Sequence, residues 1–501
     1  MKDYSFGNFL LELRKRSGLS QFQLGKLVGV TDKAVSKWEN SSSKPEISLL
    51  LELATVLGVT VDELLTCKYN SSYDEKREGV FAMKKDIWQK VQKNLKEKYG
   101  ENQHIEVSNR FLSEFSVLKD DDIIIYWDLI SEINKLAELK GCYIRSWGTI
   151  GSSFVAYLLG ATEVNPLRAH YYCPKCHNVE FSDTEYCGWD LEDKKCYCGT
   201  TFVKDGHNIS FESVSSTLYQ GAHFDLCVPK EIAEETKSLI EKHFEGCKFL
   251  NVAIEPKDMV KGIVVIDDNN SEVVSGETIS IEEKLKKFTK YPSFNILENK
   301  TLDSVKELYR LTGSSYKYSD YYSNRVLEEF KNNNTENILE FGSERLKKLI
   351  DKCKPVSYGD LLKLNGLSHS TDAFENNAEI LLSEGHKLKN VLAFREDVFG
   401  YVRSRCLNKN ISDIGIPLKI MEDVRKGIYA RKGIPEDIRT LLINIECEEW
   451  FIESIQKIRY LFPKAHCVAI LRQALILMWY KIKFPEKFEE VSKKYNKLEK
   501  E

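Results

Sequence analysis

The stretch from residue 19 to residue 39 reads LSQFQLGKLVGVTDKAVSKWE, and it sets the architecture at the start of the chain. Ser20 and Thr31 each stand where a side-chain oxygen can accept a hydrogen bond from the first turn of a following helix. Gly29 can turn the chain between these two positions. We therefore predict two consecutive short helices, one over residues 21–28 and one that begins after Thr31.

The second predicted helix has one buried face and one exposed face. Val35 and Trp38 are three residues apart, so both side chains are expected to face inward. The outer face then consists of Lys33, Ala34, Ser36 and Lys37. An exposed helix face of this kind can enter the major groove of duplex DNA.

The surrounding sequence extends this pattern from residue 5 to residue 66. The matching motifs are Leu19-Ser20-Gln21, Val35-Ser36-Lys37-Trp38-Glu39, Lys44-Pro45 and Leu57-Gly58-Val59. In these motifs the segment resembles the Cro/C1-type (XRE) helix-turn-helix regulators. The resemblance implies an all-α, five-helix domain that binds a double-stranded DNA operator, and a homodimer would read paired half-sites. It assigns DNA contacts to Gln21, Thr31, Lys33, Ala34, Ser36 and Lys37. Use of the domain for protein contact alone is the alternative.

Composition limits the remaining possibilities. The 501 residues are enough for two or three domains. The 72 basic and 76 acidic residues nearly balance, so nucleic-acid binding must rest on local patches. We see no apolar run long enough to span a bilayer and no secretion signal at the start, so a cytoplasmic location without membrane contact is expected. The 13 cysteines then favour metal ligation or buried thiols over disulfides.

Residues 67–110 are predicted to form a linker followed by a charged helix. The loop signal is the polar run at residues 70–73, and apolar residues recur every four positions at Ile87, Val91 and Leu95. The same helix carries Lys90, Lys93, Lys96 and Lys98. These lysines form either a phosphate-facing surface or an ordinary solvated face.

Two close cysteine pairs predict a metal site between residues 171 and 207. Cys173 and Cys176 are followed, after 19 residues, by Cys196 and Cys198. Four thiolates at this spacing can bind one tetrahedral Zn²⁺ and leave no position open for substrate, so the site is expected to be structural. Cys187 lies between the pairs and is a reserve ligand.

A second resemblance covers the chain from about residue 120 to residue 488. It is carried by Glu163-Val164-Asn165-Pro166-Leu167, Lys204-Asp205-Gly206-His207, Gly366-Leu367-Ser368-His369-Ser370-Thr371-Asp372 and Phe462-Pro463-Lys464-Ala465-His466. These motifs resemble the PolC-type DNA polymerase III alpha subunit. The resemblance implies a multidomain α+β protein. It places a polymerase beta-like palm remnant with the zinc knuckle at 111–300, mostly helical fingers at 301–490 and a charged tail at 491–501.

The same resemblance identifies a degenerate catalytic centre. The family has aspartates at three positions that are occupied here by His223, Asp225 and Asn295. Two-metal nucleotidyl transfer needs hard anionic ligands around Mg²⁺, and only Asp225 supplies one. We therefore expect no catalytic residues, no bound Mg²⁺ and a pseudoenzyme rather than an enzyme.

Other family positions are retained only in part. Gly148, Thr149, Gly151 and Ser152 resemble the palm loop that holds the triphosphate, but Trp147 stands where the family has an arginine. Most of the family's segment between the second and third aspartates is missing. Ser368, His369, Lys464 and His466 match fingers residues. They either contact nucleic acid or nucleotide or are kept for the fold.

The leading hypothesis is a sequence-specific DNA-binding regulator whose inactive polymerase-like body acts as a sensor or interaction module. Such a protein is expected in a phage, a mobile element or a defence locus. Its body would meet a replication protein, a phage protein or primer-template DNA. One alternative is an active, truncated DNA-directed DNA polymerase. It would be truncated in the sense that we expect the protein to lack the family's PHP, exonuclease, clamp-binding and tail elements. Another is a decoy or competitor at the replisome.

Overall fold

The computed structural model describes residues 5–497 with several gaps. The gaps are 18, 58, 60, 69–73, 119–122, 184–185, 214–222, 254–259, 267–273, 281–286, 288–290 and 315–320. The loop predicted at residues 70–73 lies outside the described residues. The chain divides into two compact units, the first mainly before Glu132 and the second mainly after it.

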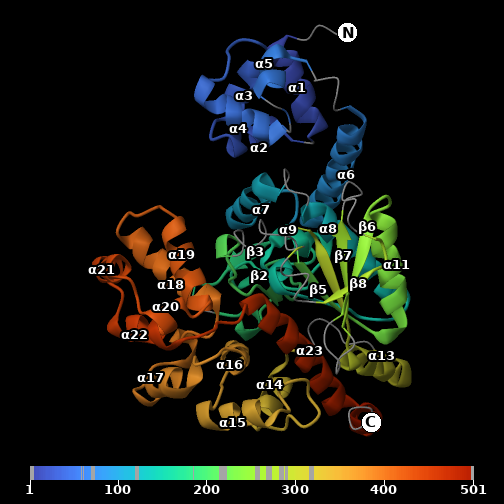
Figure 1. The fold of residues 1–501 in the computed structure, drawn as a ribbon, viewed down its shortest axis with the longest axis vertical. Helices are drawn as coiled ribbons and strands as arrows, with labels where there is room; N and C mark the ends of the chain where they lie inside the picture. Colours follow the sequence, from blue (N-terminus) through green and yellow to red (C-terminus); the bar gives the residue numbers. More distant parts are fainter. Residues whose placement is uncertain are drawn as a thin grey trace. The chain divides into compact units, whose positions relative to one another are not determined.

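The first unit contains a bundle of five short helices at the start of the chain (Figure 1). They are α1 (Phe6–Arg16), α2 (Gln21–Leu27), α3 (Asp32–Glu39), α4 (Ile47–Leu57) and α5 (Val61–Thr66). Every helix contributes a buried apolar side chain to the core, among them Phe9, Leu24, Val35, Leu53 and Leu64. The predicted five-helix head is therefore confirmed.

Local hydrogen bonds explain where α2 and α3 begin. Ser20 Oγ accepts a hydrogen bond from Gln23 N at 3.1 Å, while Ser20 N donates to Gln23 Oε1 at 2.8 Å, a reciprocal capping box. Thr31 Oγ1 accepts from Ala34 N at 3.2 Å. A Cβ at Gly25 would lie 2.8 Å from a carbonyl oxygen of the turn between the helices, so this tight turn requires glycine. Both predicted caps are confirmed.

A second group of helices in the first unit packs through aromatic and aliphatic side chains. Its members are α6 (Asp74–Tyr99), α7 (Ile105–Leu118) and α9 (Phe154–Leu159). Ile87, Val91 and Leu95 of α6 are buried, as their four-residue spacing predicts. Between α7 and α9 the chain forms α8 (Ile123–Leu139).

The domain boundary predicted at residue 110 is wrong, because it falls inside α7. Phe111 and Phe115, just beyond that boundary, have ring centroids 5.3 Å and 4.1 Å from the Trp88 ring. Since α7 packs on α6, the predicted charged helix belongs to the same folded unit as the residues after position 110.

The four lysines of α6 have partners within the protein. These are Asp128 for Lys90, Glu97 for Lys93, Glu101 for Lys96 and the Tyr157 ring for Lys98. The pairs at Lys93 and Lys96 are exposed and contribute little to stability. This pairing favours a solvated helix face over a phosphate-binding surface.

The second unit contains a mixed sheet of six strands (Figure 1). In spatial order these are β1 (Arg145–Trp147), β5 (His223–Val228), β9 (Ser293–Glu298), β7 (Val260–Ile266), β6 (Lys248–Ala253) and β8 (Thr278–Ser280). The pairs β5–β9 and β6–β8 are parallel, and the other neighbours are antiparallel. Between β5 and β6 the chain forms α11 (Ala233–His243), which contacts β9.

A smaller sheet contains strands on both sides of each cysteine pair in the sequence. Its strands in spatial order are β3 (Val179–Phe181), β2 (His170–Tyr172) and β4 (Val203–Asp205). A short 3₁₀ turn, η2 (Gly188–Asp190), precedes β4. A Cβ at Gly188 would lie 2.1 Å from Asp205 O, so only glycine lets this turn approach the strand.

The rest of the second unit is helical, as predicted for the fingers-like region. The helices are α13 (Lys300–Thr312), α14 (Asn324–Lys331), α15 (Glu344–Cys353), α16 (Tyr358–His369), α17 (Glu379–Ser383), α18 (Arg395–Asn408), α19 (Gly415–Arg425), α20 (Ile428–Lys432), α21 (Glu436–Asn444), α22 (Glu449–Lys457), α23 (Lys464–Lys483) and α24 (Pro485–Lys497). The charged tail predicted from residue 491 is wrong as far as Lys497, because these residues continue α24 and Val491 is buried.

Helix α23 forms the centre of this helical region. By length and composition it could cross a membrane, which corrects the expectation that no run of residues is apolar enough. However, 83% of its most apolar window is buried inside the fold. A helix that is apolar on all sides is expected in the middle of a large core.

A buried carboxylate stabilises the helix group of the first unit. Glu114 Oε2 accepts hydrogen bonds from Phe154 N at 2.8 Å and Val155 N at 3.1 Å, at the start of α9. The same side chain is fully buried and pairs with Arg110. It therefore satisfies amide groups that α9 cannot satisfy itself.

We predict that Glu114→Ala lowers the free energy of unfolding by about 3–5 kcal/mol, since it removes a buried carboxylate that pairs with Arg110 and accepts from two backbone amides. Glu114→Gln keeps one acceptor oxygen and should cost less. Urea denaturation measures both, with Glu97→Ala on the exposed face of α6 as the matched control. Equal effects of Glu114→Ala and Glu97→Ala would contradict this role.

Candidate functional site

Helix α3 presents the predicted base-reading face. Val35 and Trp38 are buried, as expected, while Lys33 and Lys37 are exposed. Ala34 and Ser36 are partly exposed on the same face. The structure therefore brings the predicted outer-face residues together on one helix that carries two positive charges.

A buried glutamate fixes the start of α2 against the end of α3. Glu39 pairs with Arg14, whose Nη1 also donates to Leu19 O at 2.6 Å. Gln21 Nε2 donates to Glu39 Oε2 at 2.7 Å. Gln21, the predicted phosphate contact, is thus held by Glu39 at the first turn of α2. The sequence motifs did not predict this network.

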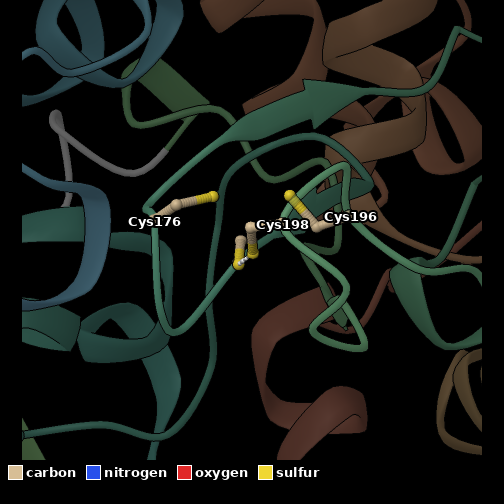
Figure 2. A group of neighbouring side chains, drawn as sticks. Cys176, Cys196 and Cys198 are labelled. Atoms are coloured by element: carbon tan, nitrogen blue, oxygen red, sulfur yellow. Dashed lines mark hydrogen bonds between the residues drawn. The ribbon is translucent and has the colours of Figure 1, made fainter.

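The four predicted zinc ligands gather in one place. Each offers a sulfur atom, and the four sulfurs lie within 4.8 Å of one another. Figure 2 shows the side chains of Cys176, Cys196 and Cys198 around a common space. Tetrahedral coordination at a Zn–S distance of about 2.3 Å places sulfurs about 3.8 Å apart. The group could therefore hold a metal ion such as zinc with little movement.

The backbone around the second cysteine pair forms a tight turn. Gly199 N donates to Cys196 O at 2.9 Å, and Cys196 N donates to Thr200 O at 2.8 Å. Gly199 has φ of +83°, which favours glycine. This turn aims both sulfurs of the pair toward the first pair although only one residue separates them.

Cys187, the reserve ligand, is not a member of the sulfur group. Its sulfur lies 3.5 Å from His207 Nδ1, and burial raises the pKa of the Cys187 thiol far above its ordinary value. Burial also lowers the pKa of His207 to about 3. In this structure Cys187 therefore packs against His207 in the core, apart from the four gathered sulfurs.

The three predicted catalytic positions lie on β5 and β9, which are adjacent and parallel in the large sheet. Asp225 on β5 and Asn295 on β9 are partners in register. Asn295 Nδ2 donates a hydrogen bond to Asp225 Oδ1 at 2.7 Å. The remaining carboxylate is therefore bonded to an amide donor. His223 is in register with Ser293 two pairs earlier, and its side chain lies outside the described residues.

The strand that faces Asn295 leaves room for the amide. Gly262 on β7 is the register partner of Asn295, and a Cβ there would lie 2.9 Å from Asn295 Oδ1. A side chain at this position would collide with the amide. Gly262 therefore helps to hold the amide beside Asp225.

A buried arginine lies near the same centre and was not predicted. Trp147, which replaces the family arginine, pairs in register with Asp225. Two residues earlier, Arg145 lies on the same face of β1 and donates to Gln473 Oε1 at 2.6 Å. A cation is thus present two residues from Trp147, although it is buried. The alternation of side chains along a strand could have indicated it.

The predicted nucleotide loop forms a 3₁₀ turn, η1 (Gly148–Ser152). Gly151 and Ser152 are buried, and a Cβ at Gly151 would lie 2.9 Å from Ala465 Cβ at the start of α23. The small residue therefore allows η1 to pack against α23. Thr149 lies in the same turn, but the environment of its side chain lies outside the described residues.

The retained fingers residues separate into two groups. His369 Nε2 lies 2.6 Å from Glu340 Oε2, and the His369 ring stacks on Phe462. His466 lies near that ring pair, and burial lowers its pKa to about 3, with Arg145 adding to the effect. Lys464 lies in a different environment, with its Nζ 3.4 Å from the centroid of the Tyr186 ring. Ser368 donates to a carbonyl oxygen of its own helix at 2.7 Å.

Comparison with known families agrees with this division of the chain. Residues 10–64 match the helix-turn-helix family model. Residues 85–246 match the bacterial DNA polymerase III alpha NTPase domain, and residues 299–410 match the finger domain of the same subunit. The chain thus joins an XRE-type helix-turn-helix domain to domains of the DNA polymerase III alpha type. The polymerase match begins earlier than the predicted start of the body, at a residue within α6.

Individual relatives point to one branch of that family. The chain is 29% identical over 501 residues to the DNA polymerase III PolC-type of Ureaplasma parvum serovar 3, an alignment that covers 83% of this chain and 34% of the relative. It is 30% identical over 506 residues to that of Mycoplasmopsis pulmonis, covering 86% and 34%. The enzyme of Bacillus cereus is 26% identical over 521 residues, covering 89% and 35%. The chain spans about a third of the length of these PolC-type relatives.

We predict that His466 makes the fold sensitive to acid. Its pKa in the folded protein is about 3, below the ordinary value of 6.5, so protons bind preferentially to the unfolded chain between these values. Stability is therefore complete above pH 6.5 and falls as the pH decreases. His466→Gln should remove about 2 kcal/mol of the loss between pH 6.5 and pH 5. Urea midpoints that decline in parallel for both proteins would exclude this contribution.

Proposed function

We propose that the chain is a sequence-specific DNA-binding regulator whose polymerase-like body no longer transfers nucleotides and serves as a sensor or interaction module. The observation that carries this proposal is the hydrogen bond from Asn295 Nδ2 to Asp225 Oδ1. It occupies the one carboxylate left at the three aspartate positions of the family. The body would then retain a fold that has lost its chemistry, since fold and active site are separate properties.

Charge at the degenerate centre argues against two bound magnesium ions. Asp225 supplies a single negative charge, and Asn295 has replaced a carboxylate by a neutral amide. Two-metal catalysis requires anionic oxygens that bridge both ions, and Mg²⁺ prefers hard ligands in octahedral geometry. The buried guanidinium of Arg145 adds positive charge to the same neighbourhood. A pair of divalent cations would be repelled as well as poorly bound.

The head supports DNA recognition through α3. Its exposed lysines stand on a helix whose start is fixed by Thr31 and whose end is fixed by Glu39. A rigid helix of this kind can present Lys33 and Lys37 to base edges or phosphates in a major groove. We propose that the operator is read by a homodimer, because regulators of this type use paired half-sites.

The metal proposed for the four-cysteine group is one structural zinc. Four thiolates fill a tetrahedral shell and leave no position for water, so the ion would stabilise the knuckle without taking part in a reaction. Cys173 and Cys196 are buried, which would protect the ion from exchange.

The partners of the body are proposed from its likeness to PolC-type relatives. Primer-template DNA, a replication protein or a phage protein that targets the polymerase are the candidates. A regulator with such a body would fit a phage, a mobile element or a defence locus, and would work in the cytoplasm.

We predict that the full chain binds one family of duplex sequences and that Lys33→Ala with Lys37→Ala alters this selection. Loss of a base contact should cost about 1–3 kcal/mol at the affected position, whereas loss of a phosphate contact weakens all sequences alike. Selection from a random duplex library measures both effects. Lys15→Ala, an exposed lysine of α1, is the control. An unaltered motif and unaltered affinity in the double variant would refute the proposed reading face.

We predict one zinc ion per chain, measured by elemental analysis of freshly purified protein. Cys176→Ser should lose the ion and lower the melting temperature, because structural zinc contributes directly to folding. Cys353→Ser, at a thiol outside the sulfur group, should keep it. Metal-free wild-type protein with the same stability as Cys176→Ser would show that the cysteines are only packed together.

We predict no primer extension with Mg²⁺ or Mn²⁺. Activity should stay absent even in His223→Asp with Asn295→Asp, because Trp147 replaces a triphosphate contact and the shortened segment after β5 removes others. The control is Asp225→Ala. Extension by the unmodified chain above this control would identify an active polymerase instead, the alternative that the sequence leaves open.

A further inference from the structure

A pocket of about 560 Å³ lies within the helical part of the second unit. Its wall includes Tyr186, Lys363, Lys389, Arg403, Trp450 and Lys464. Neither Asp225 nor Asn295 lines it. Since Lys464 and His466 are two residues apart on α23, their side chains leave the helix in different directions. The pocket is therefore distinct from the degenerate polymerase centre.

The floor of the pocket carries a buried ammonium group. Lys464 is 1% exposed, and its Nζ lies 3.4 Å from the centroid of the Tyr186 ring. Among the described residues no carboxylate oxygen lies within 4.0 Å of this nitrogen. Burial lowers the pKa of Lys464 to about 7. An ammonium group with so little solvation would gain from an anion in the pocket.

The nearby carboxylates are already occupied. Asp397 Oδ2 accepts from Lys363 Nζ at 2.8 Å and from two backbone amides at 2.9 Å each. Glu396 pairs with Arg395 at 3.1 Å. Glu448, the third carboxylate that lines the pocket, pairs with Arg405 at 2.7 Å. Each of these negative charges therefore has its own cation, and Lys464 is left in excess.

The rim adds two cations and an aromatic wall. Lys389 and Arg403 line the pocket and form no ion pair within the part of the chain that the structure describes. Tyr401 and Trp450 stand on the same side with ring centroids 5.5 Å apart. The positive charges of the lysines and the arginine can bind phosphate groups. The exposed parts of the two aromatic side chains can stack on a flat ring such as a nucleobase.

We propose that this pocket binds a free nucleotide, with its phosphates between Lys464, Lys389 and Arg403 and its base against Tyr401 and Trp450. The volume is in the range of small-molecule sites. The inference does not require DNA binding by the head. It gives the body a ligand of its own, so nucleotide binding would be the input of the proposed sensor.

The test is isothermal titration of the full chain with ATP, GTP, their mono- and diphosphates and inorganic pyrophosphate. We expect a nucleotide to bind below 1 mM, and Lys389→Glu with Arg403→Glu to weaken binding at least tenfold. Lys432→Glu, an exposed lysine of α20 outside the pocket, should leave it unchanged. Because these three residues are at least partly exposed, the variants should fold. Lys464→Met, checked for an unaltered melting temperature, should also lose binding.

Three outcomes would overturn the proposal. One is the absence of binding by any of these probes at 1 mM. The second is binding that Asp225→Ala abolishes while Lys389→Glu with Arg403→Glu does not, which would place the nucleotide in the degenerate centre. The third is competition by 5′-phosphorylated single-stranded DNA but by no free nucleotide, which would make the pocket a site for a DNA end. Failure of the regulator proposal would instead appear as lost operator selection with nucleotide binding intact.

Discussion

The parallel pairing of β5 with β9 is the constraint on which the second unit depends. It joins strands whose central residues are 70 positions apart and places Phe224 directly beside Phe294, with ring centroids 5.0 Å apart. Both rings are buried, so they lock the register. On the opposite face the same register brings Asp225 and Asn295 into contact. The packing of the two phenylalanine rings on one face of the sheet thus sets the register that pairs Asp225 with Asn295 on the other face.

Under the proposed function, that contact would let a polymerase-type body persist without polymerase chemistry. Two adjacent carboxylates would repel each other in the absence of metal, whereas an amide beside one carboxylate forms a hydrogen bond. The Asp225–Asn295 pair is therefore favourable in the metal-free protein. Gly262 leaves space for the amide, and Arg145 is held by Gln473 on α23. These contacts support the proposal that the centre no longer holds catalytic metals.

Local features could be predicted from the sequence. Ser20 and Thr31 cap their helices through hydrogen bonds that span three residues, so spacing alone indicates them. The cysteine pairs are also local, and the structure gathers all four sulfurs. The mixed fold of the body was predicted only through its resemblance to a known family, since periodicity does not specify strand order. The C-terminal helix was missed because its polar face looks like a tail, although Val491 is buried.

Contacts between distant residues could not be predicted in this way. Arg145 and Gln473 are 328 positions apart, and no local pattern pairs them. The burial of Lys464 is similar, because its pocket is assembled from segments that meet only in the folded protein. A lysine in a sequence is expected to be solvated. Its desolvation against Tyr186 becomes visible only when the helices are packed.

The most direct test of the account is Mn²⁺ binding at the degenerate centre, measured by electron paramagnetic resonance on the metal-loaded full chain. Mn²⁺ substitutes for Mg²⁺ and binds the same oxygen ligands. The account predicts that wild-type protein and Asp225→Ala bind the same amount of Mn²⁺, because the Asp225 carboxylate is bonded to Asn295. A Mn²⁺ site present in the wild-type protein and lost in Asp225→Ala would contradict the claim that this body has lost its catalytic metals.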